Sequence, residues 1–373
     1  MKIGLDAKRI FNNPTGLGVY GRNLLQGFNK IDSNNQYILY TPKHRNTYFD
    51  TANLNKNFEV FEGRGSAGYF WRTFSIVKDI RAAELDIYHG LSNELPYNIK
   101  NSKAKNIVDI HDLCFVRYPG DYSLFDRKVF WQKAKRAAHF SDKIIATSEA
   151  TKQDIVRYLE INEDKIEVVY QCCDKRFYEA LSQKALNELR EKYQLPRKYV
   201  LCVGTIQGRK NQKAILKAMA LLPKTEQIPI VLVGNGTRYL EEVKTLGKKL
   251  NVAVRIKRKI GNEDLPGIYQ MATIFVYPSF IEGFGIPVLE AMASKIPVIS
   301  CKETSMAEIL QNEEALIDPY DGQELALKMH QFLKGSNTEQ IAQNFKRAQE
   351  FSQEKFAQEI LDIYKKLCEA PAK

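Results

Sequence analysis

The sequence predicts an α/β protein made of two halves, each with a parallel sheet covered by helices on both faces. Short apolar runs typical of buried strands alternate with helical patterns along almost the whole chain, and this rhythm is that of parallel sheets. The 373 residues are enough for two domains of ordinary size. We place the first domain at 1–180, the second at 195–350 and a C-terminal helical segment at 351–373.

Each half carries its own series of strand-like runs. In the first half these runs are Lys2–Ala7, Gln36–Thr41, Phe58–Phe61, Asp86–His89, Lys105–Ile110, Asp142–Thr147 and Ile166–Tyr170. In the second half they are Tyr199–Gly204, Ile228–Val233, Val252–Ile256, Ile274–Tyr277, Pro297–Cys301 and Ala315–Asp318. Residues 171–196 join the halves, and Pro196 marks a break there.

The composition favours a globular protein of the cytoplasm. No run reaches the roughly 18 apolar residues of a membrane-spanning helix, and the first residues lack the apolar core of a signal peptide. The six cysteines show no CxxC spacing, so we expect reduced thiols and no zinc site. The net charge of +11 attracts nucleic acid, anionic lipid or anionic small molecules, and charge alone does not choose among them.

Residues 277–294, YPSFIEGFGIPVLEAMAS, form the most informative stretch. A strand-like run ends at Pro278, a glycine-rich loop follows, and Pro287 suits the first turn of a helix. Backbone N–H groups and the positive end of the helix dipole gather at such a point. We place two carboxylates beside it, Glu282 in the loop and Glu290 in the first turn of the helix. Helix capping is one interpretation of these carboxylates; a site for a phosphorylated, polyhydroxylated ligand is the other.

The same stretch resembles the donor-site segment of glycosyltransferase family 4, which contains retaining enzymes of the GT-B fold. The family's two glutamates, with Gly-Phe-Gly and Pro between them, are matched without a gap. The resemblance implies that Glu282 and the amides of Gly283, Phe284 and Gly285 hold the transferred sugar, and that Glu290 holds the ribose. It also implies two Rossmann-like domains facing a central cleft, with the C-terminal helix packing back on the N-terminal domain.

A second glycine-rich loop, NNPTGLGVY, follows the first strand and precedes a helix. This order is that of a phosphate cradle, although a plain tight turn uses glycine in the same way. In the family the loop approaches the diphosphate of the donor. The resemblance therefore implies that Gly16 and Gly18 contact that diphosphate.

His111 ends a strand, at the edge of an open sheet where ligands bind. A buried core histidine is the alternative interpretation. The segment His111-Asp112-Leu113, with Tyr118-Pro119 after it, resembles a family segment whose His lies beside the transferred sugar and the reacting centre. The resemblance makes His111 and Glu282 the catalytic candidates. We expect Glu282 to bind sugar hydroxyls and not to act as a nucleophile.

Arg209 and Lys210 precede a helix whose dipole they oppose, so their placement is locally unfavourable. A diphosphate bound at this point would make the two cations favourable, because they and the helix N–H groups would then face an anion. The simpler interpretation is that both side chains are solvated charges. The segment resembles the diphosphate-binding segment of the family, with Arg-Lys-Asn intact. It departs from the pattern just before, at Gln207-Gly208.

Two segments, Tyr69–Val77 and Phe125–Phe140, mix aromatic side chains with Arg and Lys. The first interpretation is an amphipathic helix whose Trp and Phe side chains pack on the sheet while its cations are solvated. The alternative is a patch that contacts the inner surface of the membrane.

The resemblance implies a retaining hexosyltransferase that uses no cofactor. Because no Asp-x-Asp is present to hold a metal, we also expect the enzyme to be metal-independent. Its substrates would be a nucleotide-diphosphate sugar, GDP-mannose or a UDP-sugar, and a glycan or lipid-linked acceptor in cell-surface polysaccharide synthesis. We expect no nucleic-acid partner. The alternatives are a nucleotide-sugar epimerase on the same fold and, less favoured, a basic nucleic-acid-binding module.

Overall fold

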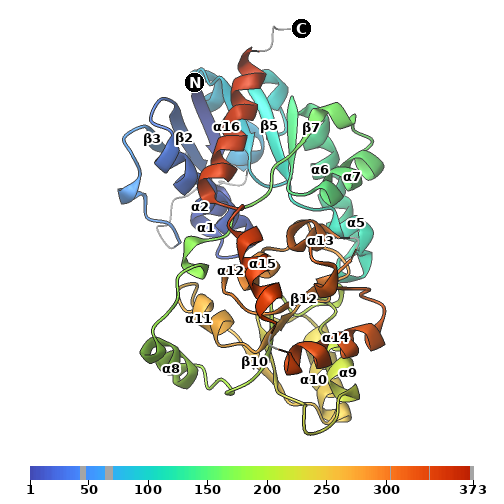
Figure 1. The fold of residues 1–373 in the computed structure, drawn as a ribbon. Coiled ribbons are helices and arrows are strands. Elements are labelled where there is room, and N and C mark those ends of the chain that lie inside the picture. Colours follow the sequence, from blue (N-terminus) through green and yellow to red (C-terminus); the bar gives the residue numbers. More distant parts are fainter. Residues whose placement is uncertain (43–47, 64–69, 303, 336, 370–373) are drawn as a thin grey trace. The chain divides into compact units, whose positions relative to one another are not determined.

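The structure is a computed structural model that describes residues 1–42, 48–63, 70–302, 304–335 and 337–369 (Figure 1). The chain divides into two compact units. The first comprises Met1–Val116, Tyr122–Cys172 and the segment from Phe351 onward; the second comprises Arg117–Asp121 and Cys173–Glu350. The change of unit at Cys173 precedes the expected boundary at 180, because Phe177 packs edge-on against Tyr269 of the second unit, with ring centroids 5.5 Å apart.

Among the described residues, the first unit contains one sheet with the strand order β3-β2-β1-β4-β5-β6-β7. Every neighbouring pair is parallel. The strands are β1 (Lys2–Asp6), β2 (Gln36–Thr41), β3 (Phe58–Glu62), β4 (Ile87–Gly90), β5 (Lys105–Ile110), β6 (Lys143–Ala146) and β7 (Ile166–Val168). Their apolar composition follows from burial on both faces, as expected for a parallel sheet.

Helices cover this sheet, and several begin at capping side chains. Ser123 accepts a hydrogen bond from the amide of Asp126, and Ser148 accepts one from the amide of Thr151. The α-helices of the unit are α1 (Lys8–Asn12), α2 (Gly16–Ile31), α4 (Ile76–Ala82), α5 (Cys114–Arg117), α6 (Leu124–Phe140), α7 (Glu149–Leu159) and α16 (Gln353–Glu369). Short helical turns of the unit are η1 (Thr51–Asn53), η2 (Trp71–Ser75), η3 (Ile99–Asn101) and η5 (Glu163–Lys165), whereas η4 (Pro119–Asp121) belongs to the second unit.

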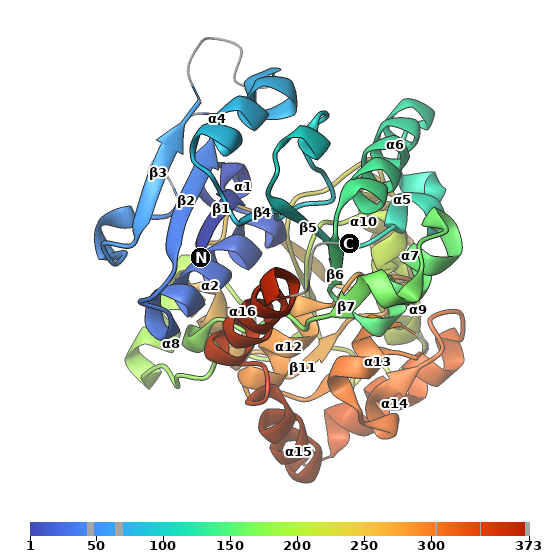
Figure 2. The same cartoon turned by 90° about the horizontal axis from the view of Figure 1, so that it is seen from above.

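The last helix, α16, packs along α2 in the first unit (Figures 1 and 2). Gly27 of α2 permits the close approach, since a Cβ there would lie 2.7 Å from the Cβ of Ala357. Tyr364 of α16 is fully buried, and its hydroxyl lies 2.6 Å from Nδ1 of His89 on β4. The C-terminal segment therefore belongs to the core of the N-terminal unit.

The second unit contains a parallel sheet with the order β10-β9-β8-β11-β12-β13 in the part of the chain that the structure describes. Its strands are β8 (Val200–Val203), β9 (Ile230–Val233), β10 (Val254–Lys257), β11 (Ile274–Val276), β12 (Val298–Cys301) and β13 (Leu316–Ile317). Its α-helices are α8 (Gln183–Lys192), α9 (Gln212–Leu221), α10 (Tyr239–Leu250), α11 (Leu265–Gln270), α12 (Ile286–Ala293), α13 (Ser305–Leu310), α14 (Gly322–Lys334) and α15 (Thr338–Ala348). Its other short turns are η6 (Lys175–Phe177), η7 (Gly208–Lys210) and η8 (Glu313–Ala315).

Both sheets place their first six strands in the same order, 3-2-1-4-5-6, which is the Rossmann order. The prediction of two Rossmann-like α/β domains is confirmed. In each sheet the strand order reverses beside the first strand, between β1 and β4 and between β8 and β11. Ligands of such sheets bind outside the carboxyl ends of the strands at this switch point. The residues that follow these four strands are therefore candidates for a binding site.

Candidate active site

In the second unit, the loops that follow β8 and β11 meet at the switch point of the sheet. The first loop ends in η7 with Arg209 and Lys210, and the second carries Glu282. Oε2 of Glu282 lies 2.9 Å from Nη1 of Arg209, and Nζ of Lys210 donates a hydrogen bond to Oε1. The structure thus brings together three residues that the sequence singled out separately.

These charges are buried. The side chains of Glu282 and Lys210 are each 9% exposed and that of Arg209 is 13% exposed. Burial alone would raise the pKa of Glu282, but Arg209 and Lys210 outweigh it and lower the pKa to about 2. Glu282 is therefore a carboxylate at neutral pH, and it compensates two cations that the dipole of the next helix disfavours.

Three further side chains hold Glu282 and Lys210 in place. Ser279 donates a hydrogen bond to Oε1 of Glu282. The hydroxyl of Ser305 donates a hydrogen bond to the backbone carbonyl of Glu282 at 2.9 Å. The hydroxyl of Tyr277 accepts a hydrogen bond from Lys210, whose Nζ also lies 4.9 Å from the centre of the tyrosine ring. Sequence reasoning placed Tyr277 at a strand end without a role and did not select either serine, because their partners are set by the fold.

The backbone conformation of the Arg-Lys-Asn segment explains why its third residue is asparagine. Asn211 adopts a left-handed conformation, with φ 54°, between η7 and α9, and asparagine tolerates that region better than most residues. Just before it, the amides of Gly208 and Arg209 donate to the carboxylate of Asp121 at 3.1 and 2.9 Å. The segment departs from the family pattern at Gln207-Gly208, and this is where it contacts Asp121. A Cβ at Gly208 would lie 2.7 Å from Oδ1 of Asp121.

The loop Gly283–Gly285 leads directly into α12. Gly285 has φ 103°, and a Cβ there would lie 2.8 Å from Cγ of Met306, so only glycine fits. Pro287 lies in the first turn, as predicted. The side chain of Phe284 is 3% exposed and belongs to the core, so its role toward a ligand would fall to its backbone.

Glu290 is the fifth residue of α12, and no acidic residue lies in the first turn of that helix. The expectation of a first-turn position is wrong, because the helix begins at Ile286. Glu290 instead accepts a hydrogen bond from the hydroxyl of Tyr269 at 2.7 Å. Burial raises the pKa of Glu290 to about 8, against the opposing effects of this hydrogen bond and of Arg176. Helix capping does not explain the residue.

In the first unit, Gly16 and Gly18 lie within the first turn of α2 and not in a loop before it. A Cβ at Gly18 would lie 1.8 Å from the carbonyl oxygen of Asn13, whereas a Cβ at Gly16 would meet nothing within 4 Å. Gly18 is thus required by the tight entry into the helix. Packing inside the unit therefore does not require glycine at position 16.

His111 follows β5 and is 7% exposed. Its Nε2 lies 2.9 Å from the carbonyl oxygen of Leu91, and its ring meets that of Tyr20 edge-on, with centroids 4.6 Å apart. Since a carbonyl oxygen only accepts hydrogen bonds, Nε2 carries a hydrogen and Nδ1 is the nitrogen that remains basic in the neutral ring. The residue lies at the strand end that sequence reasoning predicted.

Two structural observations bear on metals and membranes. The described residues contain no group of three or more His, Cys, Asp or Glu side chains arranged to hold a metal ion. Over the same residues, no helix combines the length and the apolar character that crossing a bilayer requires.

The fold and this site define a class of protein: whole-chain structural similarity is to enzymes of the GT-B type. A sucrose-phosphate synthase from Thermosynechococcus elongatus matches with a TM-score of 0.78 at 19% identity, covering 98% of this chain and 99% of that one. Anabaena HepE, solved in complex with UDP and glucose, matches with a TM-score of 0.76 at 19% identity, covering 98% of this chain and all of that one (100%).

Sequence comparison then identifies the family. Residues 187–350 match the model "Glycosyl transferases group 1", and residues 14–177 match "Glycosyltransferase Family 4". The O-antigen chain mannosyltransferase B of Escherichia coli is 30% identical over 290 residues, which cover 75% of this chain and 74% of that protein. The chain belongs to glycosyltransferase family 4, the group 1 glycosyl transferases, and the resemblance stated from the sequence is confirmed.

A further relative is longer than this chain. The serotype-specific mannosyltransferase WbdA of Escherichia coli is 27% identical over 262 residues, which cover 67% of this chain but only 32% of that protein. The similarity therefore concerns about a third of that relative.

Proposed function

We propose that this glycosyltransferase transfers mannose, with retention of configuration, from a nucleotide-diphosphate sugar to a glycan or lipid-linked acceptor in cell-surface polysaccharide synthesis. The observation that carries the proposal is the cluster of Arg209, Lys210 and Glu282 at the switch point of the second sheet. It combines cations for a diphosphate with a carboxylate for sugar hydroxyls. Mannose is favoured because relatives over most of the chain are named mannosyltransferases.

Each residue of the cluster would have a separate role. Arg209 and Lys210 would neutralise the diphosphate, and Gly16 and Gly18 would allow its close approach. Glu282 and the amides of Gly283, Phe284 and Gly285 bind the sugar. Glu290 binds the ribose, and His111 lies at the reacting centre.

The chemistry would be electrostatic. As the bond to the sugar breaks, negative charge develops on the diphosphate, and preorganised cations stabilise it without a metal ion. The acceptor hydroxyl attacks from the face that the diphosphate leaves, and a phosphate oxygen takes its proton. Glu282 holds Lys210 and Arg209 in the structure; we propose that it exchanges this partnership for sugar hydroxyls when the diphosphate takes over the cations.

We further propose that the enzyme acts in the cytoplasm, peripherally at the membrane where a lipid-linked acceptor would be found. The exposed Lys128 and the exposed aromatic side chains of α6 support this location.

Product analysis tests the reaction. The protein is incubated with GDP-mannose or UDP-glucose, with and without a mannose-terminated acceptor, and the new linkage is assigned by NMR. An α-linked product from an α-linked donor supports retention. Conversion of the donor in the absence of acceptor would favour an epimerase, and an inverted linkage would overturn the mechanism. Activity should survive EDTA; loss that added Mg²⁺ restores would contradict the metal-free proposal.

The variant Glu282→Gln tests the site. It keeps the size of the side chain but removes the charge, and we expect turnover to fall about 100-fold, with a folded protein confirmed by circular dichroism. Wild-type transfer by this variant would refute the role of Glu282.

A further inference from the structure

The helix α6 exposes most of its aromatic side chains, and only Phe140 at its end packs against a core cluster. It buries Ala134, Ala137 and Ala138, and it leaves large apolar side chains exposed: Leu124 80%, Phe125 75%, Phe130 41% and Trp131 38%. The expectation that the Trp and Phe of this segment pack on the sheet is wrong for Phe125, Phe130 and Trp131, whereas Phe140 packs against the core. It holds in the other aromatic-basic segment for Trp71, which is 7% exposed and stacks on Phe61. Exposed large apolar side chains are a feature of surfaces that bind a ligand or a partner.

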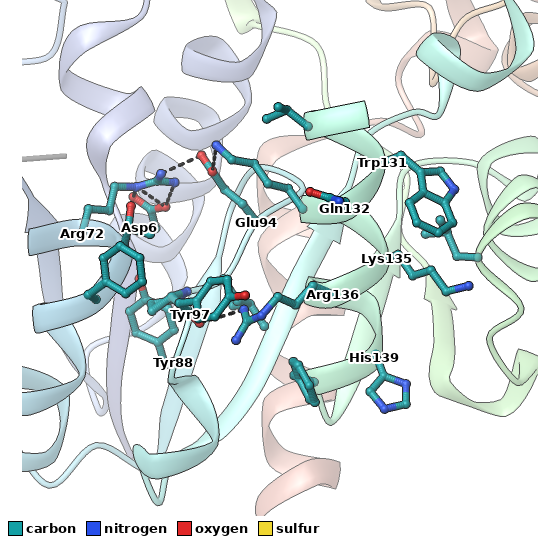
Figure 3. Close-up of a pocket in the computed structure, with 18 of the residues that line it drawn as sticks. Asp6, Arg72, Tyr88, Glu94, Tyr97, Trp131, Gln132, Lys135, Arg136 and His139 are labelled. Atoms are coloured by element: carbon teal, nitrogen blue, oxygen red, sulfur yellow. Dashed lines mark hydrogen bonds and ion pairs between the residues drawn. The ribbon is translucent and has the colours of Figure 1, made fainter. Parts of the chain in front are cut away.

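A groove of about 900 Å³ runs beside α6 in the first unit (Figure 3). Its walls are η2, residues 94–97 after β4, and the stretch of α6 from Val129 to Phe140, which is roughly 16 Å of helix. Asp6, the last residue of β1, and Glu94, which follows β4, line it as well. The groove therefore includes the switch point of the first sheet, where ligands of such sheets bind.

Aromatic rings line part of the groove. The rings of Phe74 and Tyr97 lie 5.5 Å apart, and the ring of Phe70, which is not a lining residue, lies 6.1 Å from that of Phe74. The guanidinium of Arg136 lies 3.9 Å from the ring of Tyr97 and 4.9 Å from that of Phe140. Figure 3 shows Arg136 directed toward Tyr97, whereas Trp131 and Lys135 point to the other side of the helix. Phe74, Tyr97 and Phe140 therefore give the groove an apolar surface beside the guanidinium of Arg136.

The charges of the groove are mostly matched by carboxylates. Arg72 pairs with Asp6 and Glu94, Lys133 pairs with Glu94, and Lys135 pairs with Glu160. Arg136 differs, because no carboxylate among the described residues lies within ion-pair distance of it, and its guanidinium donates to the backbone carbonyl of Pro96 at 3.3 Å. An anion at Arg136 would complete the charge balance of the groove.

We propose that this groove binds one anionic amphiphile, a phosphate ester of a long hydrocarbon chain. Its phosphate would lie at Arg136 and its chain along Phe74, Tyr97 and Phe140. The aromatic side chains of the groove favour a ligand with a long hydrocarbon chain. Arg136, which has no carboxylate partner among the described residues, favours an anionic group. An anionic amphiphile combines the two features. This inference goes beyond the transfer reaction and does not depend on it, since binding is measured without a sugar donor.

Tryptophan fluorescence provides a local readout, because the chain has two tryptophans. Trp71 begins η2, whose next three residues line the groove, and Trp131 belongs to the stretch of α6 that borders it. We would titrate the protein with farnesyl phosphate below its critical micelle concentration, with farnesol, with inorganic phosphate and with phosphatidylglycerol vesicles. Saturable binding of farnesyl phosphate, at least tenfold tighter than that of farnesol or phosphate, is expected. Equal affinity for farnesol, or a response to vesicles alone, would overturn the proposal.

Two substitutions locate the ligand. Arg136→Met should weaken farnesyl phosphate binding about tenfold or more, whereas Lys128→Met, which removes an exposed cation of α6 outside the groove, should leave it unchanged. Gln132→Phe should also weaken binding, because it narrows the groove from an exposed position. Circular dichroism and thermal melts establish that each variant is folded. Equal losses in Arg136→Met and Lys128→Met would show diffuse electrostatic attraction and refute the site.

Discussion

Glu282 is a buried carboxylate that contacts two cations at once, and this arrangement explains why the residues need one another. An isolated buried charge is strongly disfavoured, and a pair is retained only where hydrogen bonds satisfy both partners. Ser279 and Tyr277 supply those hydrogen bonds to Glu282 and Lys210. The cluster is thus electrostatically prepared for an anion while remaining stable in itself.

Lys210→Met should weaken binding of nucleoside diphosphates at least tenfold and leave nucleoside binding nearly unchanged, because a buried ammonium contributes to the diphosphate alone. Calorimetry with GDP, UDP, guanosine and uridine measures the difference. Lys213→Met is the matched control, since Lys213 lies in the next turn and pairs with the more exposed Glu242. Equal losses for diphosphates and nucleosides would contradict diphosphate contact by Lys210.

Glu290 should make stability fall as pH rises. Its pKa is about 8 in the folded protein against 4.5 for the ordinary group, so the folded state binds the proton more tightly. The resulting stabilisation is complete below about pH 4.5 and is lost as pH rises through about 8, by at most about 4–5 kcal/mol.

Denaturant unfolding of wild type and Glu290→Gln between pH 5 and pH 9 measures this contribution, and the variant should show the flatter profile. Glu282 does not interfere, because its lowered pKa affects stability only in acid, as pH falls from about 4.5 toward 2. Parallel profiles for the two proteins would show that Glu290 is ionised throughout.

At the scale of the element, both loops of the site are strand-to-helix connections whose backbone conformation selects particular residues. Asn211 before α9 and Gly285 before α12 both have positive φ. These two positions turn the chain so that Lys210 and Glu282 meet above the ends of β8 and β11. Some residues between strand and helix are therefore required by the backbone conformation, and others supply the charges of the site.

Gly285→Ala should destabilise the protein by about 1–3 kcal/mol, since alanine is strained at φ 103° and its Cβ would meet Met306. Urea unfolding monitored by circular dichroism provides the value. Gly322→Ala is the control, because a Cβ there meets nothing within 4 Å, and it should be neutral. Equal stability of the two variants would mean that the loop relaxes without strain.

At the scale of the molecule, the last helix belongs to the first unit although the second unit separates the two in sequence. Phe356, Ile360 and Tyr364 of α16 lie in the same core cluster as Leu24 and Phe28 of α2. The first unit therefore completes its core only when the end of the chain is present.

Ile360→Ala should destabilise the first unit by about 2–5 kcal/mol, because Ile360 is fully buried (0% exposed) in that core. Tryptophan fluorescence reports on this unit alone, since Trp71 and Trp131 both lie in it. Lys355→Ala on the exposed side of α16 should change the fluorescence transition little. A shift seen by circular dichroism but absent from the fluorescence transition would contradict the assignment of α16 to the first unit.

The sequence predicted the fold well because its signals are local. Every predicted strand has a counterpart, and Pro287 lies in the first turn of its helix as expected. Three expectations failed for the same reason. Glu290 lies in the second turn of α12, Gly16 and Gly18 lie in the first turn of α2, and α6 exposes most of its aromatic side chains. A helix boundary or a buried face depends on what packs against it and not on periodicity alone.

By itself, the sequence determined the alternation of strands and helices, the glycine-rich loops and the spacing of the charged residues, all of which are properties of neighbouring residues. Only the tertiary structure decided which of them meet. Lys210 and Glu282 are 72 positions apart, and they come together because β8 and β11 are neighbours in the sheet. Strand order is a long-range choice, made by the packing of whole elements, and no local pattern encodes it.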